Sequence, residues 1–483
     1  MSQKKKRSLG TFGILICVLL LVAAASLFVA GKPYVDADGV EQVVNGATIH
    51  DILMAPINGF HDAGDVIGFV FCLGAFLAIV NKTGALETGI HALVKKLHGK
   101  ELVLIPILMF IFSVGGTTYG MCEETVGFYI LLASTMMAAG MDPIVGAAVV
   151  LLGAGVGVLG STINPFATGA AVAGAASRGV DVNMGKVYIL GIILWLGSYA
   201  ISTLFVMNYA KKVLKNKGSI LTQDQLDECK TAYGGADELD DNVKMTGKQK
   251  AVLWIFAFTF VIMIMGFIPW MDLLGEDKGL AIFGWSEFLT GNPFGWWWFD
   301  DAATWFVLMG LLIGLIGMED KSEMSKTVIA GVADMVSVNL VIALARATSV
   351  LMATTGLGNW LVEASVTALS KSGMSAPVFG FLDYLLHLGL SFLVPSSSGL
   401  AGLSSPIVSP IVAGMNWSVE TSIMILVAAN GLINLFTPTC GAIMGGLALA
   451  RIPWATWVKW AWKVILAIGI FAAVVLVGGM ILL

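Results

Sequence analysis

The sequence predicts an all-α polytopic membrane protein made of two inverted repeats, each with a re-entrant helical hairpin and a broken helix. Three observations carry this prediction. The 483 residues are 57% hydrophobic and only 12% charged, with a mean hydropathy of +0.87, whereas soluble domains carry about 25% charged residues. Two long apolar stretches are interrupted at their centres by small polar residues. The two halves of the chain pass through the same events in the same order.

Composition also excludes several classes of protein. A net charge of −5 gives no electrostatic support for a nucleic-acid partner, which needs a basic surface. The five cysteines form no CxxC pair, so neither disulfides nor a metal site are expected. The basic start is followed by an apolar stretch too long for a signal peptide, which predicts a first membrane helix.

Apolar runs of about 18 residues or more indicate membrane-spanning helices. We expect spans near 9–30, 64–81, 143–176, 185–208, 249–269, 303–318, 327–351, 420–450 and 461–482. The two interrupted stretches, near 102–139 and 378–411, are expected to be the hairpins. These elements divide into a first repeat with the N-terminal helix (1–209), a polar cytoplasmic connector (210–248), and a connecting helix with the second repeat (249–483).

Lysine and arginine gather on the cytoplasmic side of membrane proteins. The basic clusters at 4–7, 95–100, 211–217, 321–326 and 451–459 all fall inside only if both interrupted stretches enter and leave the membrane on one side. This predicts a bacterial cytoplasmic (inner) membrane protein with its N-terminus inside and its C-terminus outside.

The repeats comprise residues 64–208 and 328–482. Each has a first span, an amphipathic stretch, a hairpin with a polar tip, a long span broken by a proline (Pro165 and Pro438), and a final unbroken span. An odd number of crossings separates them, so their orientations are opposite. Inverted repeats with broken helices are typical of secondary transporters, which bind substrate near the bilayer midplane.

The hairpin tips "GGTTYG" and "PSSSG" and the two breaks leave hydroxyls and backbone amides free for a ligand, although these hydroxyls could instead satisfy backbone groups. A coupling Na⁺ could bind near Asn164 and Thr437. The candidate polar residues are Thr117, Thr118, Ser396, Ser397 and Ser398 in the tips, and Ser161, Thr162, Asn164, Thr437 and Thr439 beside the prolines.

Charges at membrane depth are costly and usually serve function. Glu123, Glu124 and Arg346 lie in apolar tracts. Arg346 could neutralise one glutamate in a structural pair. Alternatively, a glutamate binds an ammonium or guanidinium group, or couples transport to H⁺, while Arg346 helps to bind a substrate carboxylate.

Simpler roles are expected for the remaining polar residues of the spans. Asp383 and His387 are spaced i, i+4 and share a helix face, as a local hydrogen-bonded pair or a proton relay, and a role in pH dependence is open. Asp65 and Asp334 begin expected spans, where capping of the helix N-terminus is the default role. The segment "GAGVGVLG" (153–160) lies in a span without a βαβ context. Its small residues therefore indicate close helix packing rather than nucleotide binding.

The sequence resembles YfcC-type carriers of the C4-dicarboxylate anaerobic carrier (DcuC-like) family, within the ion-transporter superfamily. The segments that carry this resemblance are "NKTGALETGI" (81–90), "GGTTYGMCEETVGFY" (115–129), "LLGAGVGVLGSTINPFATG" (151–169), "FLVPSSSGLAGLSSPI" (392–407) and "LFTPTCGAIMGGLALAR" (435–451). The resemblance implies a scaffold and a mobile transport domain, a homodimer, and elevator-like movement. Family members have been named both dicarboxylate carriers and basic amino acid antiporters.

Two acids against one arginine at membrane depth favour a cationic or zwitterionic substrate over a dicarboxylate. We therefore expect a basic amino acid antiporter of the arginine/ornithine type in the lipid bilayer. The alternative is a C4-dicarboxylate or other organic-anion symporter coupled to Na⁺ or H⁺. An enzyme is not expected, because the chain has no HExxH or GxSxG motif, and no cofactor is expected. A channel is disfavoured because no selectivity-filter repeat is present.

Overall fold

A computed structural model describes residues 11–36, 39–96, 100–215, 218–233, 245–371 and 373–483. Within these residues, nine helices are long and apolar enough to cross a membrane. The expectation of an all-α polytopic membrane protein is therefore confirmed. Helices that match expected spans or amphipathic stretches are α1 (Thr11–Phe28), α3 (Gly64–Lys82), α4 (Ala85–Lys96), α9 (Met184–Leu214), α11 (Gly247–Phe267), α15 (Phe299–Gly317), α16 (Met324–Thr355), α17 (Leu357–Ser370) and α22 (Trp454–Leu482).

Both interrupted stretches break where the sequence predicts. The first consists of α5 (Leu104–Tyr119), a 3₁₀ turn (Glu123–Gly127) and α6 (Phe128–Ala138). Gly120 ends α5 with φ of 79°, a conformation that glycine adopts without strain. The second consists of α18 (Ala376–Leu393) and α19 (Ser397–Gly414). Ser396 caps α19, because its hydroxyl accepts a hydrogen bond from the Gly399 amide at 3.2 Å.

The two long spans are also broken near their prolines. The first divides into α7 (Pro143–Gly160), a π-helical turn (Pro165–Gly169) and α8 (Ala170–Ala176). The second divides into α20 (Val419–Ile433) and α21 (Gly441–Leu449). Four to seven residues of non-helical chain therefore lie between the helical parts of each span.

Glycines let the central helices approach closely. A methyl group on Gly116 of α5 would lie 2.1 Å from the Ala154 carbonyl oxygen of α7. A methyl group on Gly431 of α20 would lie 2.4 Å from the α-carbon of Leu159, also on α7. The interpretation of 153–160 as a packing segment is thus confirmed, with α7 at the centre of the molecule.

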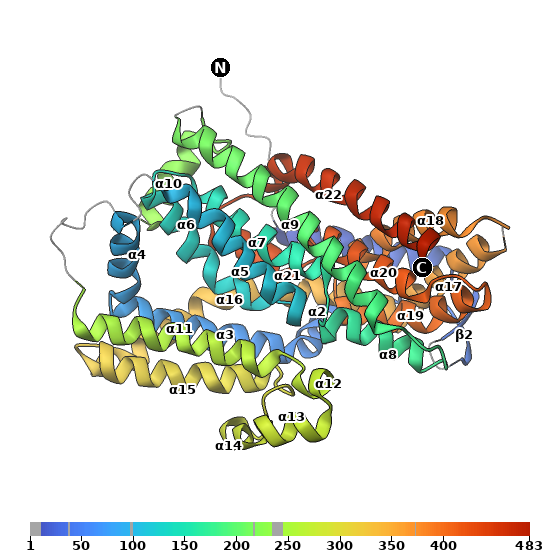
Figure 1. Ribbon diagram of the computed structural model, residues 1–483, viewed down its shortest axis with the longest axis horizontal. Coiled ribbons are helices and arrows are strands. Elements are labelled where there is room, and N and C mark those ends of the chain that lie inside the picture. Colours follow the sequence, from blue (N-terminus) through green and yellow to red (C-terminus); the bar gives the residue numbers. More distant parts are fainter. Residues whose placement is uncertain (1–10, 37–38, 97–99, 216–217, 234–244, 372) are drawn as a thin grey trace.

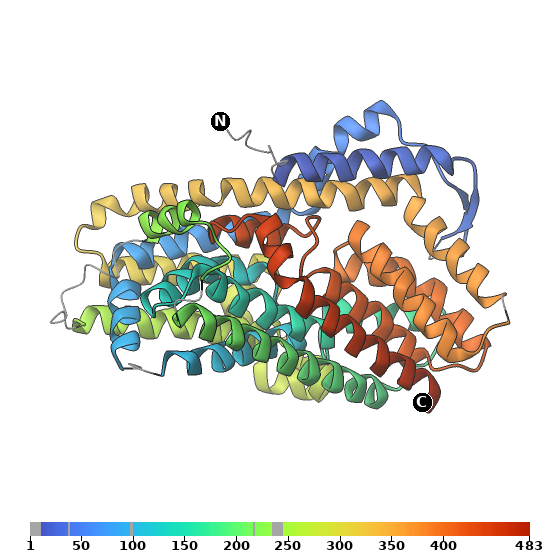
Figure 2. The same cartoon turned by 90° about the horizontal axis from the view of Figure 1, so that it is seen from above.

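The two hairpins reach this centre from opposite ends of the molecule. Figure 1 shows α5, α6 and α7 on the left, and α18, α19 and α20 on the right, so that the breaks meet in the middle. Figure 2 shows α1 lying along the long helix α16, which runs the length of the molecule.

Three small structures were not expected from the sequence. Helix α2 (Ile49–Asp62) precedes α3 and packs against α16, where a methyl group on Gly59 would lie 2.4 Å from the Ala343 carbonyl oxygen. An antiparallel ribbon joins β1 (Pro33–Val35) and β2 (Glu41–Val43). Short helices α12 (Trp270–Leu274), α13 (Glu276–Phe283) and α14 (Glu287–Thr290) project from one edge.

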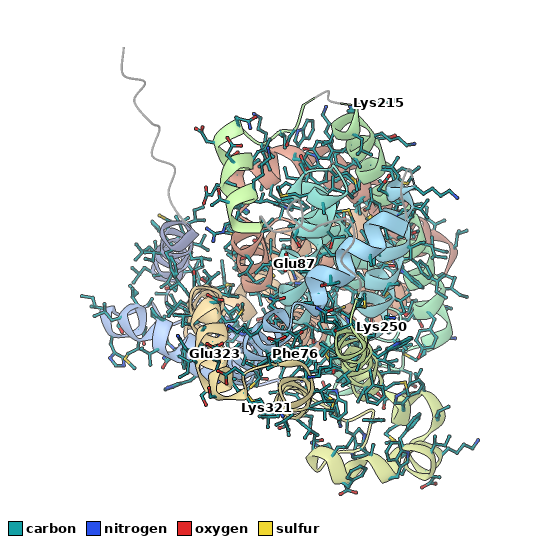
Figure 3. The ribbon with its side chains drawn as sticks, turned by 90° about the vertical axis from the view of Figure 1, so that its left-hand side faces the viewer. Phe76, Glu87, Lys215, Lys250, Lys321 and Glu323 are labelled. Carbon is teal, nitrogen blue, oxygen red and sulfur yellow. The ribbon has the colours of Figure 1, made fainter. Side chains whose placement is uncertain are left out.

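The connector lies at one end of the molecule, which Figure 3 views directly, with Lys215, Lys250 and Lys321 labelled. It contains helix α10 (Gln223–Tyr233). The buried carboxylate of Asp142, the N-cap of α7, accepts hydrogen bonds from the Tyr209 and Ser219 hydroxyls. Burial raises the pKa of this carboxyl, and those two hydroxyls oppose the rise. Asp142 thus fastens the start of the connector to the helical body.

Candidate substrate site

A cavity of about 170 Å³ lies where the two hairpin tips and the two broken spans meet. Helix α16 forms another wall, and the start of α3 and the residues before α15 complete it. Seven of the residues predicted for the site line this cavity. They are Glu123, Glu124, Arg346, Ser396, Ser397, Ser398 and Thr439.

The first hairpin tip supplies the two glutamates. Both belong to the 3₁₀ turn that follows the bend at Gly120. Glu124 is only 3% exposed, and its carboxylate accepts a hydrogen bond from the Cys122 amide at 3.1 Å. Glu123 is half-buried. The bend that breaks the helix here turns these two adjacent side chains toward the same cavity.

Arg346 forms its ion pair with a residue that was not predicted from the sequence. Its Nε lies 3.0 Å from Oδ2 of Asp62, the last residue of α2. No ion pair joins Arg346 to Glu123 or Glu124 among the described residues, although its charge acts on the Glu123 carboxylate. The sequence left open an ion pair between Arg346 and one of these glutamates. The structure contains the pair with Asp62 instead.

The second hairpin tip is held by two asparagines of α20 and the break that follows it. Asn434 Nδ2 donates to the Pro395 carbonyl at 2.7 Å, and Asn430 Nδ2 to the same oxygen at 3.3 Å. The Ser397 hydroxyl donates to Asn430 Oδ1 at 2.8 Å. The Ser398 side chain is exposed and lines the cavity. The N-terminus of α19 therefore faces the cavity.

The polar residues of the first break stabilise the fold behind the cavity and do not line it. The Thr117 hydroxyl accepts from the Thr162 amide at 3.1 Å, and Thr118 donates to the Val114 carbonyl at 2.7 Å. Asn164 Oδ1 accepts from the Phe166 amide at 2.9 Å, while its Nδ2 donates to the Ser161 hydroxyl at 2.9 Å. For Thr117, Thr118, Ser161, Thr162 and Asn164, the alternative of satisfying backbone and neighbouring groups fits best.

The second break is similar in part. The Thr437 and Thr439 hydroxyl oxygens lie 2.7 Å apart, and Thr439 donates to the Phe392 carbonyl at 2.7 Å. Thr439 lines the cavity and Thr437 does not. Binding of Na⁺ near Asn164 and Thr437 stays a prediction.

Sequence reasoning missed Asp65 and Trp298, which lie together in the cavity wall. Trp298 Nε1 donates to Asp65 Oδ2 at 2.7 Å, and the Trp298 ring packs on Phe166 with centroids 4.6 Å apart. Asp65 is not the N-cap of α3, which is Ala63, but it lies in the first turn, where its Oδ1 accepts a hydrogen bond from the Val66 amide at 2.8 Å. Asp334 likewise lies inside α16 and caps nothing.

Three further cavity residues carry polar atoms that lack a hydrogen-bond partner in the described chain. These atoms are the Tyr119 hydroxyl, the Ser349 hydroxyl and Asn434 Oδ1. Buried polar atoms are nearly always hydrogen-bonded, so an unpaired group in a cavity wall indicates a ligand or water. A polar residue within an apolar span, as in "VAANGLINLF" for Asn434, is the signal that could have found such residues.

The charge of the cavity wall is negative overall. Its described lining holds three carboxylates, from Asp65, Glu123 and Glu124, against the one guanidinium of Arg346, which Asp62 already pairs. The site contains unpaired polar atoms, two helix breaks and excess acid, and the described residues offer no cluster of His, Cys, Asp and Glu that would hold a metal ion.

Comparison with known proteins decides the family. The sequence profile described as "C4-dicarboxylate anaerobic carrier" (DcuC) matches residues 11–481. The chain belongs to this family. It is therefore a secondary transporter and an integral membrane protein of a bacterial carrier family, not an enzyme.

Relatives and solved structures agree with this assignment of the carrier. An uncharacterized protein of Haemophilus influenzae is 28% identical over 450 residues, which cover 91% of this chain and 79% of that protein. An Escherichia coli protein named "Putative basic amino acid antiporter YfcC" is 25% identical over 422 residues, covering 86% and 77%. The crystal structure of the Alcanivorax borkumensis YdaH transporter matches with a TM-score of 0.50 and 15% identity, covering 97% of this chain and 98% of that chain. The last comparison concerns the fold alone.

Proposed function

We propose that this carrier exchanges cationic amino acids of the arginine and ornithine type across the bacterial cytoplasmic membrane. The observation that carries the proposal is the excess of carboxylates in the cavity wall, where Asp65, Glu123 and Glu124 face a single arginine paired with Asp62. Glu124 is buried without an ion pair in the described chain, and a buried carboxylate is costly unless a cation pairs with it. A substrate guanidinium or ammonium group would be that cation.

The substrate α-carboxylate would lie at the other side of the cavity. The N-terminus of α19, an 18-residue helix, faces it with Ser397 and Ser398. Helix N-termini carry partial positive charge and favour anions. Arg346 adds a full charge nearby, and the unpaired Ser349 and Tyr119 hydroxyls add hydrogen bonds. The cavity thus offers opposite charge preferences at two of its walls, as a zwitterionic amino acid with a cationic side chain needs.

Transport would follow an elevator-like movement of the hairpins and broken spans against a scaffold containing α3, α15 and α16. The support for this division is that the two breaks pack on each other through α7 and α20, whereas α3 packs on α15 and α16. A homodimer, with the N-terminus inside and the C-terminus outside, completes the proposal. The relative named a basic amino acid antiporter supports the substrate class.

The second candidate is a C4-dicarboxylate or organic-anion symporter. The family description favours it, and so do Arg346 and the helix N-terminus, which together could bind one carboxylate. In that case Na⁺ or H⁺ would have to neutralise the carboxylates of the cavity.

Counterflow in proteoliposomes separates the two candidates. Vesicles loaded with unlabelled arginine should accumulate labelled arginine, ornithine and lysine, and vesicles loaded with succinate should accumulate neither succinate nor fumarate. Accumulation of the dicarboxylates without that of the basic amino acids would overturn the proposal in favour of the second candidate.

Glu124→Gln tests the charge assignment. Removal of one of the cavity carboxylates should weaken arginine binding at least tenfold, because hydrogen bonds to charged groups contribute about 1.5–3 kcal/mol. The apparent affinity in counterflow and the arginine-induced rise in melting temperature measure the effect. Glu87→Gln on α4, an exposed glutamate that does not line the cavity, is the matched control and should leave both unchanged.

A further inference from the structure

A second buried charged cluster lies within the second hairpin, away from the cavity lining. The Asp383 and His387 side chains on α18 are 0% and 1% exposed, and His387 Nδ1 lies 3.0 Å from Asp383 Oδ1. The other ring nitrogen, Nε2, lies 2.7 Å from the hydroxyl of Ser404 on α19, which is fully buried. His387 therefore joins the two arms of the hairpin.

The Asp383 carboxylate lacks the hydrogen bonds that an ionised carboxylate normally accepts. Within the described chain, neither of its oxygens has a hydrogen bond of good geometry, because His387 Nδ1 is directed to the Asp383 carbonyl oxygen at 2.9 Å. An isolated charge in such surroundings costs several kcal/mol. The closed hairpin therefore favours a pair with no net charge. Such a pair holds one proton more than an ionised aspartate beside a neutral histidine.

The surroundings supply no other charge to compensate the pair. Helix α19 carries no ionisable side chain. The ionisable residues of the other helices packed on α18 are Glu363 of α17, Glu420 of α20, and Lys459 and Lys463 of α22, together with Tyr384 on α18 itself. Glu363 accepts from the Val35 amide, Glu420 from the Asn183 amide, and the Tyr384 hydroxyl donates to the Gly469 carbonyl. Within the described chain, the charged side chain in contact with His387 is that of Asp383.

We propose that Asp383 and His387 form a proton-binding site that takes up one proton when the two arms of the second hairpin close, and releases it when they separate. This goes beyond the proposed exchange of amino acids, because it would link net transport to the proton gradient. Ser404 lies seven residues along α19 from Ser397 at the cavity, about 10 Å at 1.5 Å per residue. Movement of α19 would therefore reach both sites.

The direction of the pH dependence follows from the proton count. In water, an aspartate titrates near 3.9 and a histidine near 6.5, so at pH 7.5 the separated pair has lost the proton that the closed pair holds. Proton uptake on closing makes the closed state fully favoured below about pH 6.5. Above that pH, the closing equilibrium weakens by up to about tenfold per pH unit, until the pH at which the closed pair itself loses the proton.

A cysteine four residues before Ser404 on α19, and therefore on the same helix face, measures closure without any substrate. Leu400 on α19 is 0% exposed, and Ser398 at the tip is exposed. We would label Leu400→Cys and Ser398→Cys with a maleimide and quantify modification at each position by mass spectrometry, so that the native cysteines do not interfere. The ratio of the two rates removes the intrinsic pH dependence of the thiol reaction. From pH 7 to 8.5 this ratio should rise with pH, by at most about tenfold per pH unit for one proton.

Three substitutions in the Leu400→Cys background distinguish the proposal from a purely structural role. Asp383→Asn leaves a neutral pair without a proton, so the ratio should become independent of pH. His387→Gln removes one of the two groups that hold the proton, so the closed state should weaken and the ratio at pH 7.5 should rise above that of the parent. Ser404→Ala removes only the hydroxyl and should keep the slope.

An equal slope in wild type and Asp383→Asn would overturn the proposal, as would a Leu400→Cys that stays unmodified at every pH. The assay needs no arginine or other solute, so failure of the proposed substrate class would leave its result intact. In proteoliposomes, an inwardly directed proton gradient, with the outside more acidic, should accelerate net uptake by wild type and not by Asp383→Asn. Both proteins should retain counterflow.

Discussion

At the scale of single residues, the structure separates groups that face the cavity from groups that only hold the chain in place. Glu123 and Glu124 could be predicted, because ionisable side chains within an apolar tract are rare and usually functional. Asp65 and Trp298 could not, since an aspartate near a helix start is indistinguishable in sequence from a cap. The partner of Arg346 could not be predicted either, because Asp62 belongs to a short helix interrupted by Pro56.

The bend at Gly120 gives a prediction at this scale. Gly120→Ala should lower the free energy of unfolding by about 1–2 kcal/mol, because a side chain at φ of 79° is strained. Its methyl group would also meet Asn164 Nδ2 at 2.7 Å. Thermal unfolding in detergent measures the loss, and counterflow should fall with it because the turn that carries Glu123 and Glu124 shifts.

Gly402→Ala on α19 is the matched control for that bend. No atom lies within 4 Å of the added methyl group, and alanine favours a helix over glycine by about 0.5–1 kcal/mol. This variant should be at least as stable as wild type. Equal stability of the two variants would mean that the first tip tolerates a side chain at its bend.

At the scale of elements, the hydropathy pattern and the breakers were sufficient for the long apolar helices and their interruptions, but not for the short helices α2, α10, α12, α13 and α14. The interruptions near 120 and 395 and the breaks near Pro165 and Pro438 lie where the sequence predicts. Helix α2 and the β1–β2 ribbon were not predicted, because they are short and mix polar with apolar residues. Their positions depend on tertiary contacts with α16 and α17, which local sequence does not contain.

The crossing of α7 and α20 gives a prediction for elements. Gly431→Ala should destabilise the protein by about 1–3 kcal/mol, because overpacking of a tight contact forces the two helices apart. The added methyl group would lie 2.4 Å from the Leu159 α-carbon. The melting temperature checks this, with Gly478→Ala on α22 as a control whose methyl group would meet no atom within 4 Å. A stable Gly431→Ala would show that this crossing is looser than described.

At the scale of the whole molecule, the sequence predicted a polytopic all-α membrane protein, which the structure confirms. Two repeats of opposite orientation stay a prediction, and the observation beside it is that residues of both hairpin tips line one cavity. Family membership could be inferred from motifs along the chain. The substrate and the coupling ion could not, because they depend on which side chains face the cavity and on how they are paired. Several hydroxyls that the sequence suggests are free for a ligand form hydrogen bonds to backbone and neighbouring groups at the breaks instead.

Relative movement of the proposed scaffold and transport domain can be tested across the contact between Phe166 and Trp298. Their rings are 4.6 Å apart, yet Phe166 belongs to the π-helical turn after α7 and Trp298 precedes α15. A short bifunctional thiol reagent on the double variant Phe166→Cys/Trp298→Cys should abolish counterflow, and a reducible reagent should allow recovery. Each single variant, treated likewise, is the control. Full activity of the linked protein would exclude movement between these two parts.

The two bends are held in different ways, and this difference has a kinetic consequence. Short threonine side chains and backbone groups hold the first, where the Ile163 amide donates to the Thr117 carbonyl at 3.3 Å and the Thr162 amide to the Thr117 hydroxyl at 3.1 Å. Flexible amide side chains dominate at the second, through Asn430 and Asn434. In the proposed carrier, two hairpin bends of unequal stiffness should open at unequal rates. The carrier should therefore rectify, with different maximal velocities for influx and efflux when gradients of equal size are imposed in opposite directions.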